Sequence, residues 1–93
     1  MELKVSSKSD VKKVAGAIAK SVRNRKENEE ITIQAIGAGA VNQTVKSIGI
    51  AREYLNPEGF DISTTINFTD VDFNGNKETA IKFNIHTLDV ENA

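Results

Sequence analysis

The sequence contains no cysteine and no tryptophan, and it has a single histidine. Without cysteine, the chain can form neither a disulfide nor a thiolate metal site, and a lone histidine has no second imidazole with which to hold a metal. The lack of cysteine fits a reducing compartment. No stretch approaches the ~20 apolar residues that a membrane span requires, and the first ten residues lack the apolar core of a signal peptide. We therefore expect a soluble, cytoplasmic protein without a metal, a cofactor or a membrane partner.

Arrangements of residues that carry out catalysis are also missing. Serine and threonine are plentiful, but His86 does not stand in a pattern that activates a nucleophile. Asp70 and Asp72 share one face of a predicted strand, and a carboxylate pair performs acid–base chemistry only in a cleft that perturbs its pKa values. The sequence indicates no such cleft, and a strand end near a bulge explains the two aspartates better. The sequence predicts a protein that is not an enzyme.

The length of 93 residues fits a single domain, with a core at about residues 2–88 and a loose tail at residues 89–93. A chain this short buries only about 60–65% of the surface that it exposes when unfolded, so pairing with a second copy would stabilise it.

Charge is distributed unevenly along this nearly neutral chain, whose net charge is −1. Up to Lys26 there are eight basic and two acidic residues, so this part carries +6. From Glu27 onward four basic residues face eleven acidic ones, which gives −7. Because salt screens charges beyond about 8–10 Å, a local positive field can persist in a neutral protein.

The first half of the chain alternates strands and helices. A strand at Glu2–Val5 precedes a helix that begins at Val11 behind a Ser9 or Asp10 cap. The strand Ile31–Ile36 then leads through the glycine loop "GAGA" (residues 37–40) into a helix from about Val41 to Leu55. The predicted core stripe of the first helix is Val11, Val14, Ala15, Ile18 and Val22, and that of the second is Val41, Thr44, Val45, Ile48, Ala51 and Leu55.

A long hairpin completes the pattern. Residues 60–68 alternate cleanly, and a change of apolar parity at Val71 predicts a bulge near Thr69 or Asp70. Asn74-Gly75 predicts a type I′ turn, in which both central residues have positive φ. The result is an α+β fold with two layers, in which two helices pack on a four-stranded mixed sheet in the order βαβαββ.

Three features qualify as candidate sites. The first helix has a basic face, with Lys12, Lys13, Lys20 and Arg23 opposite the core stripe, and Lys8 precedes it. Such a face serves phosphate contacts or simply solvation, and both interpretations stay open. The glycine loop directs free backbone N–H groups at an anion, or it is a tight turn kept small by packing. It matches no dinucleotide fingerprint, since Asn42 stands where a third glycine is needed.

The third candidate is an apolar surface. A second stripe on the second helix, Gln43, Ser47, Ile50 and Tyr54, lies off the core face. Ile50 and Tyr54 lie beside a hairpin that carries Phe68, Val71 and Phe73, and such a patch can meet its own copy. We therefore predict a homodimer whose interface consists of Ile50, Tyr54, Phe68 and Val71.

Three blocks, "LKVSSKSDVKKVAGAIAKSVR", "IQAIGAGAVNQTVKSIGIAREYL" and "TTINFTDVDFNGNKETAIKF", resemble the stage V sporulation protein S family in order and spacing. The resemblance implies a small cytoplasmic bacterial protein of spore development without catalytic activity. That family is similar in topology to the Alba nucleic-acid-binding proteins. Those are dimers that lay two loops and a hairpin arm along a duplex.

Lys8 matches the lysine of the first Alba loop, and Lys77 with Asn74 and Asn76 remains on the hairpin. Ile36, Ala38 and Gly39 occupy the place of the Alba arginines. The residues predicted to contact nucleic acid are therefore Lys8, Lys12, Lys13, Gly37, Ala38, Gly39, Asn42, Lys46, Asn74 and Lys77. Two alternatives remain: an adaptor that binds other sporulation proteins, and a regulator that binds a small anion or nucleotide at the glycine loop.

Overall fold

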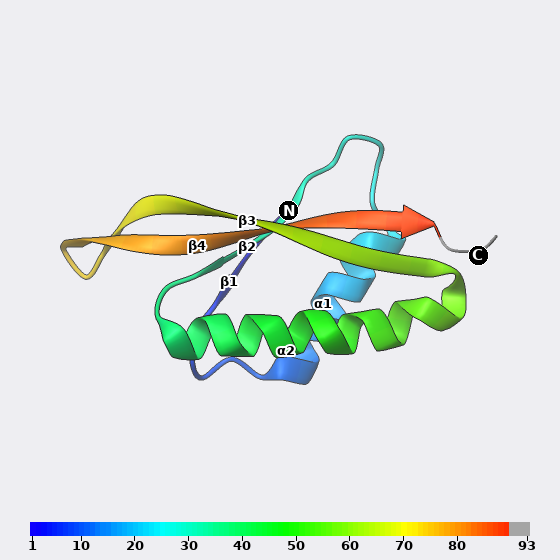
Figure 1. Cartoon of the computed structure of the whole chain (residues 1–93), viewed down its shortest axis with the longest axis horizontal. Helices are drawn as coiled ribbons and strands as arrows, with labels where there is room; N and C mark the ends of the chain where they lie inside the picture. The colour runs from blue at the N-terminus through cyan, green and yellow to red at the C-terminus, as the bar shows by residue number, and fades with distance from the viewer. Residues whose placement is uncertain (90–93) are drawn as a thin grey trace.

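The computed structural model describes residues 1–89, so residues 90–93 of the predicted tail lie outside the described part (Figure 1). The elements follow the predicted order. They are β1 (Glu2–Val5), α1 (Val11–Arg23), β2 (Ile31–Ala35), α2 (Ala38–Leu55), the short 3₁₀ helix η1 (Asn56–Glu58), β3 (Phe60–Phe73) and β4 (Asn76–Asp89). Asp89, which we assigned to the tail, is the last residue of β4.

The sheet has the strand order β1-β2-β4-β3. β1 and β2 are parallel, whereas β4 runs antiparallel to both β2 and β3, which confirms a mixed sheet. Both helices lie on one side of this sheet, and the outer part of the β3–β4 hairpin extends beyond them (Figure 1). The α+β fold with two layers is confirmed.

The core lies between the helices and the near face of the sheet. Side chains on the strands alternate between the two faces of the sheet, with Ile31, Ile33, Phe83 and Ile85 turned toward the helices. Small residues fill much of the helix side, which lets α1 and α2 pack against each other. The buried helix residues are Ala15, Ile18, Ala19, Val22, Ala40, Thr44, Ser47, Ala51 and Leu55.

The core stripe of α2 differs from the prediction at two positions. Val45 is 56% exposed, whereas Ser47, which we placed off the core face, is fully buried. Two hydroxyl groups make this possible, because Thr44 Oγ1 donates to the carbonyl of Ala40 and Ser47 Oγ donates to that of Gln43. Buried hydroxyls that are hydrogen-bonded within their own helix carry little desolvation penalty, so the buried face of α2 is rotated from its apolar stripe.

The start of α2 also differs from the prediction. The helix begins at Ala38 rather than near Val41, so most of the predicted glycine loop is its first turn. Gly37 has a φ of 90° at the N-cap, and the Val41 N–H donates to the Gly37 carbonyl at 3.1 Å. Alanine favours helix strongly enough to extend it across Gly39. At α1, Asp10 is the predicted cap, since its Oδ1 accepts from the N–H groups of Lys12 and Lys13 at 2.9 and 3.1 Å.

The hairpin turn confirms one prediction and the strand corrects another. Asn74 and Gly75 have φ values of 52° and 80°, as a type I′ turn requires. The predicted bulge is wrong, because the pairing runs without interruption from Phe60 opposite Asp89 to Phe73 opposite Asn76. The apolar residues change from even to odd positions because Val71 and Phe73 are turned to the far face of the sheet, the face opposite the helices.

Candidate functional site

The basic cluster of Lys8, Lys12 and Lys13 lies at the beginning of α1. Lys8 belongs to the β1–α1 loop (residues 6–10), and the two other lysines lie in the first turn of the helix. All three side chains are exposed, and within residues 1–89 none of them forms an ion pair. The nearby carboxylate of Asp10 accepts hydrogen bonds from the helix backbone. The cluster therefore presents three ammonium groups to solvent over six residues of chain.

The basic face does not continue to the end of α1. Arg23 Nη2 lies 2.7 Å from Oε2 of Glu58, and this hydrogen-bonded pair lowers the pKa of Glu58 below its ordinary value. The prediction that Arg23 extends the positive field is wrong, because a carboxylate from the later half of the chain neutralises it. A second pair, Arg52 with Asp61, ties α2 to β3 at 2.7 Å and holds the pKa of Asp61 well below its usual range.

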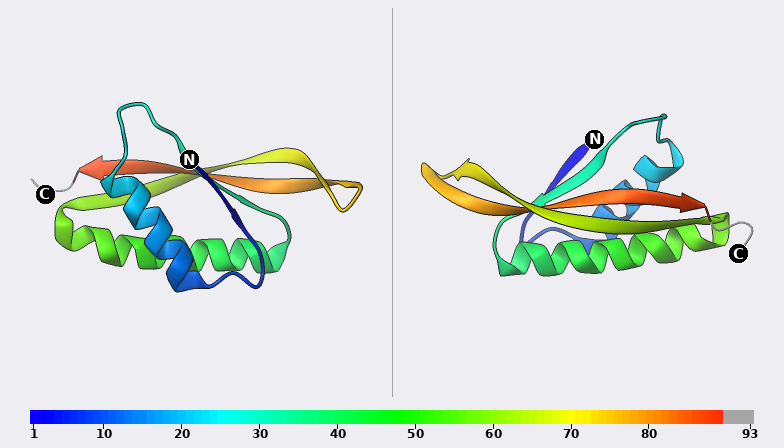
Figure 2. Two further views of the ribbon diagram at one scale, coloured as in Figure 1. Left: turned by 180° about the vertical axis from the view of Figure 1, so that it is seen from behind. Right: turned by 45° about the horizontal axis from the view of Figure 1, so that its top comes forward.

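The β1–α1 loop lies against the first turns of α2, at one end of the two-layer body (Figures 1 and 2). Gln43 Nε2 donates to the carbonyl of Ser9 at 3.0 Å. A Cβ atom placed on Gly39 would lie 2.7 Å from Cβ of Ser7, so only glycine permits this approach. The loop that carries Lys8 thus lies beside the glycine segment of α2.

Hydrogen bonds within the loop fix its shape. Ser9 Oγ accepts from the N–H of Ser6 at 2.9 Å, and Ser6 Oγ accepts from the N–H of Lys8 at 3.2 Å. The Ser9 N–H also donates to the Ser6 carbonyl at 3.1 Å. These bonds hold the backbone of Lys8 in a defined position beside α2.

The amino end of α2 supplies the second part of the site. Gly37, Ala38 and Gly39 are exposed there, and the first N–H groups of a helix have no carbonyl partner within it. Asn42 and Lys46 are also exposed and stand one turn apart on one face of α2. Free N–H groups, the helix dipole and ammonium groups all favour an anion at this end of the molecule.

The hairpin residues of the predicted site lie on a separate element. Asn74 and Lys77 are at the tip of the hairpin arm (residues 68–81), which projects past the helices (Figure 2). The arm also carries three exposed acids, Asp70, Asp72 and Glu78, of which Asp72 is the cross-strand partner of Lys77. The arm is therefore acidic overall and is not part of the basic cluster.

The predicted dimer residues do not form one patch. Ile50 is partly buried against the core, and Phe68 and Val71 point to opposite faces of the sheet. Phe68 is 72% exposed and Tyr54 39%. The prediction of a single patch is wrong, because the strand is regular where we expected a bulge.

Three other apolar side chains are exposed, and we call them the apolar edge: Val45 on α2, and Ile66 and Phe68 on β3. These side chains are 56%, 57% and 72% exposed. Ile66 shares the helix side of the sheet with its partner Phe83, and β3 is an edge strand. Arg52 on α2 pairs with Asp61 on β3, and the two elements run in opposite directions, so Val45 lies about level with residues 64–66. The sequence did not predict that Ile66 and Phe68 are both exposed, because it does not reveal how far the helices cover the sheet.

Within residues 1–89 no group of three or more histidine, aspartate or glutamate side chains is placed to hold a metal ion. None of the described helices combines the length and apolarity that crossing a bilayer demands.

Comparison with known proteins identifies the chain's relatives. The family model described as stage V sporulation protein S (SpoVS) matches residues 1–88. Among solved structures, the chain is similar to Alba from Thermoplasma volcanium, with a TM-score of 0.61 and 17% sequence identity. The match covers 96% of this chain and 99% of that one. At this identity the likeness shows an Alba-like fold.

Proposed function

We propose, from the premise that the chain belongs to the stage V sporulation protein S family, that it is a non-enzymatic, cytoplasmic protein that binds nucleic acid in sporulation. The observation that supports this most is the position of the exposed basic cluster, Lys8, Lys12 and Lys13, beside the amino end of α2. Two kinds of phosphate-binding group are thereby gathered at one end of the molecule.

The proposed contacts are with the phosphate backbone. The ammonium groups of the basic cluster pair with successive phosphates, and Lys46 with Asn42 extends the contact along α2. The N–H groups of residues 37–39 bind a phosphate oxygen at the helix amino end. None of these groups distinguishes bases, so this surface binds without regard to sequence.

The hairpin arm has a smaller part in the proposal. Its acids repel a polyanion that runs along its length, so the nucleic acid crosses the loops and does not follow the length of the arm. Lys77 and Asn74 at the tip contribute only where a long nucleic acid reaches them.

A salt titration tests the proposal. Binding of duplex DNA, single-stranded DNA and RNA is measured by fluorescence anisotropy at several salt concentrations. Four lysine contacts to a duplex, from the basic cluster and Lys46, predict a slope of about −3.6 in log K against log[salt], and about −2.8 for single strands. No measurable binding at low salt, or a slope near zero, contradicts the proposal.

We further propose that the apolar edge is covered by a second copy of the chain. Three large apolar side chains exposed beside an edge strand form the kind of surface that self-associating proteins bury. The same surface supports the second candidate function, an adaptor that binds another sporulation protein.

Phe68→Asp tests the proposed dimer. At 72% exposure the side chain contributes little to the core, so the variant is expected to fold and to have the mass of a monomer in sedimentation. The wild type is expected to have twice that mass. A wild type that is monomeric at high concentration contradicts the dimer and favours the adaptor, which then requires a different partner for the apolar edge.

A further inference from the structure

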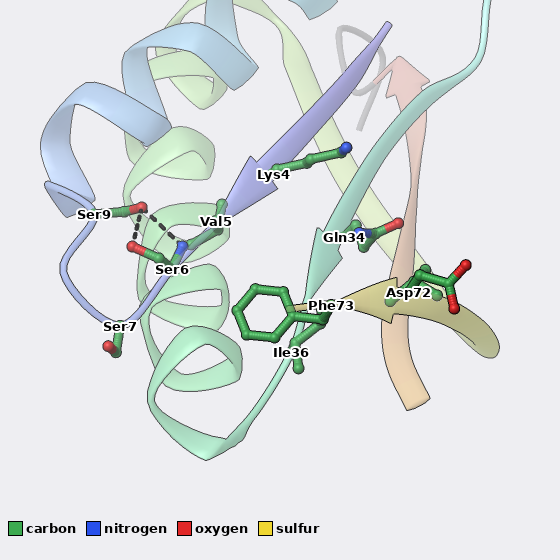
Figure 3. Close-up of a pocket in the computed structure, with 10 residues that line it drawn as sticks. Lys4, Val5, Ser6, Ser7, Ser9, Gln34, Ile36, Asp72 and Phe73 are labelled. Carbon is green, nitrogen blue, oxygen red and sulfur yellow. Dashed lines mark hydrogen bonds between the residues drawn. The ribbon is translucent and has the colours of Figure 1, made fainter. Parts of the chain in front are cut away.

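A groove lies between the end of β1, the β1–α1 loop and the end of β3, next to the turn of the hairpin arm (Figure 3). Its volume is about 560 Å³, within the roughly 300–1,000 Å³ of small-ligand sites. The wall formed by the loop consists of Ser6, Ser7 and Ser9, and the opposite wall contains Phe73 from β3. Elements from both ends of the sequence thus enclose one site.

Apolar and polar groups line different parts of the groove. Phe73 is 48% exposed, and its ring lies between the loop and Ile36 in Figure 3. Lys4 and Gln34 are partners in the parallel β1–β2 register and share the far face of the sheet. In residues 1–89 neither the ammonium group of Lys4 nor the side-chain amide of Gln34 has a hydrogen-bond partner in the protein, so both are free for a ligand.

The polar groups of Lys4 and Gln34 determine which ligand fits. The Gln34 amide both donates and accepts hydrogen bonds, and Lys4 adds a positive charge that favours a phosphate. The carboxylate of Asp72, the neighbour of Phe73 in β3, points away from the Phe73 ring (Figure 3). A flat ring with polar edges and an attached phosphate fits these walls, since the ring stacks on Phe73 and pairs its edge with Gln34.

We infer that this groove takes an unpaired nucleobase of the bound nucleic acid. The inference rests on the proposed function, because the loop that forms one wall also carries Lys8 and contacts α2 at Gly39. A strand held by the basic cluster passes the mouth of the groove. A base within a duplex is stacked on both faces and paired along one edge, so only a base of a single strand can enter.

The readout is the ratio of affinities for a 12-nucleotide single strand and for a blunt 12-base-pair duplex, both dye-labelled and measured by fluorescence anisotropy. Phe73→Ala is expected to weaken single-strand binding about tenfold, within the range for loss of one stacked base, and to leave duplex binding within about twofold. Phe73→Leu, which keeps an apolar side chain without a flat ring, is expected to have the same effect and guards against a folding defect. Phe68→Ala, on the opposite face of the same strand, is the matched control and leaves the ratio unchanged.

The outcomes separate this inference from the proposed function. Suppose that Phe73→Ala and Phe73→Leu bind the single strand as the wild type does, while the double variant Lys12→Glu with Lys13→Glu no longer binds. In that case the groove inference alone is overturned. Equal losses for single strand and duplex also overturn it, because the ring then acts through the fold. A wild type that binds neither probe overturns the proposed function and the inference with it.

Discussion

Replacing Lys12 and Lys13 together by glutamate is expected to weaken nucleic-acid binding about tenfold or more and to reduce the salt slope by about 2. Each lysine contact to a phosphate that is lost removes the release of about one counterion from the nucleic acid, and each introduced carboxylate adds repulsion. Both side chains are exposed in the first turn of α1, so the fold is expected to persist. The backbone N–H groups that Asp10 accepts from belong to these residues and are unaffected by the change.

A charge-matched control makes this result specific. Lys20 and Lys26 are also exposed, and they lie at the far end of α1 and beyond it. Their joint replacement by glutamate changes the net charge by the same amount. We expect this control to keep most of the affinity and a slope close to that of the wild type. Equal losses in the two double variants would show that overall charge, and not the basic cluster, governs binding.

Gly39→Ala is expected to destabilise the protein by about 1–3 kcal/mol, even though alanine favours helix over glycine. The added Cβ would lie 2.7 Å from Cβ of Ser7, an atom next to the backbone that cannot rotate away. The steric overlap is therefore relieved only when the β1–α1 loop moves away from α2, and this movement also displaces Lys8. Thermal or denaturant unfolding measures the loss of stability, and an accompanying loss of nucleic-acid affinity is expected.

Gly49→Ala is the control for helix propensity. Gly49 is exposed in the middle of α2, and no heavy atom lies within 4 Å of its added Cβ. This variant is expected to be more stable by about 0.5–1 kcal/mol, because alanine restricts the unfolded chain. If Gly39→Ala is stabilised to the same degree, the contact between the loop and α2 does not exist as described.

The sequence was sufficient for the element order because local signals agreed with the fold. Asp10 caps α1 and Asn74-Gly75 turns the hairpin, and both signals are set by residues next to one another. The sequence was insufficient where a tertiary contact decides. Val45 is exposed and Ser47 buried because α1 packs against α2 from a direction that the apolar stripe does not indicate.

The candidate site was predictable only in its local part. The residues of the basic cluster are close in sequence, and α1 begins at Val11, so Lys8 precedes the helix and Lys12 and Lys13 lie in its first turn. The neutralisation of Arg23 by Glu58 and the approach of Ser7 to Gly39 each join distant segments, so no local pattern reveals them. The same holds for the groove, in which Lys4 of the first strand faces the same space as Phe73.

Mapping of backbone amide chemical shifts during titration with a 12-base-pair duplex would locate the nucleic-acid contact on the protein. We predict that the largest changes occur at residues 6–13 and 37–42, which form the β1–α1 loop, the start of α1 and the amino end of α2. Changes concentrated on the far face of the sheet, around Asn84 and His86, would place the contact on another surface and contradict the proposed function.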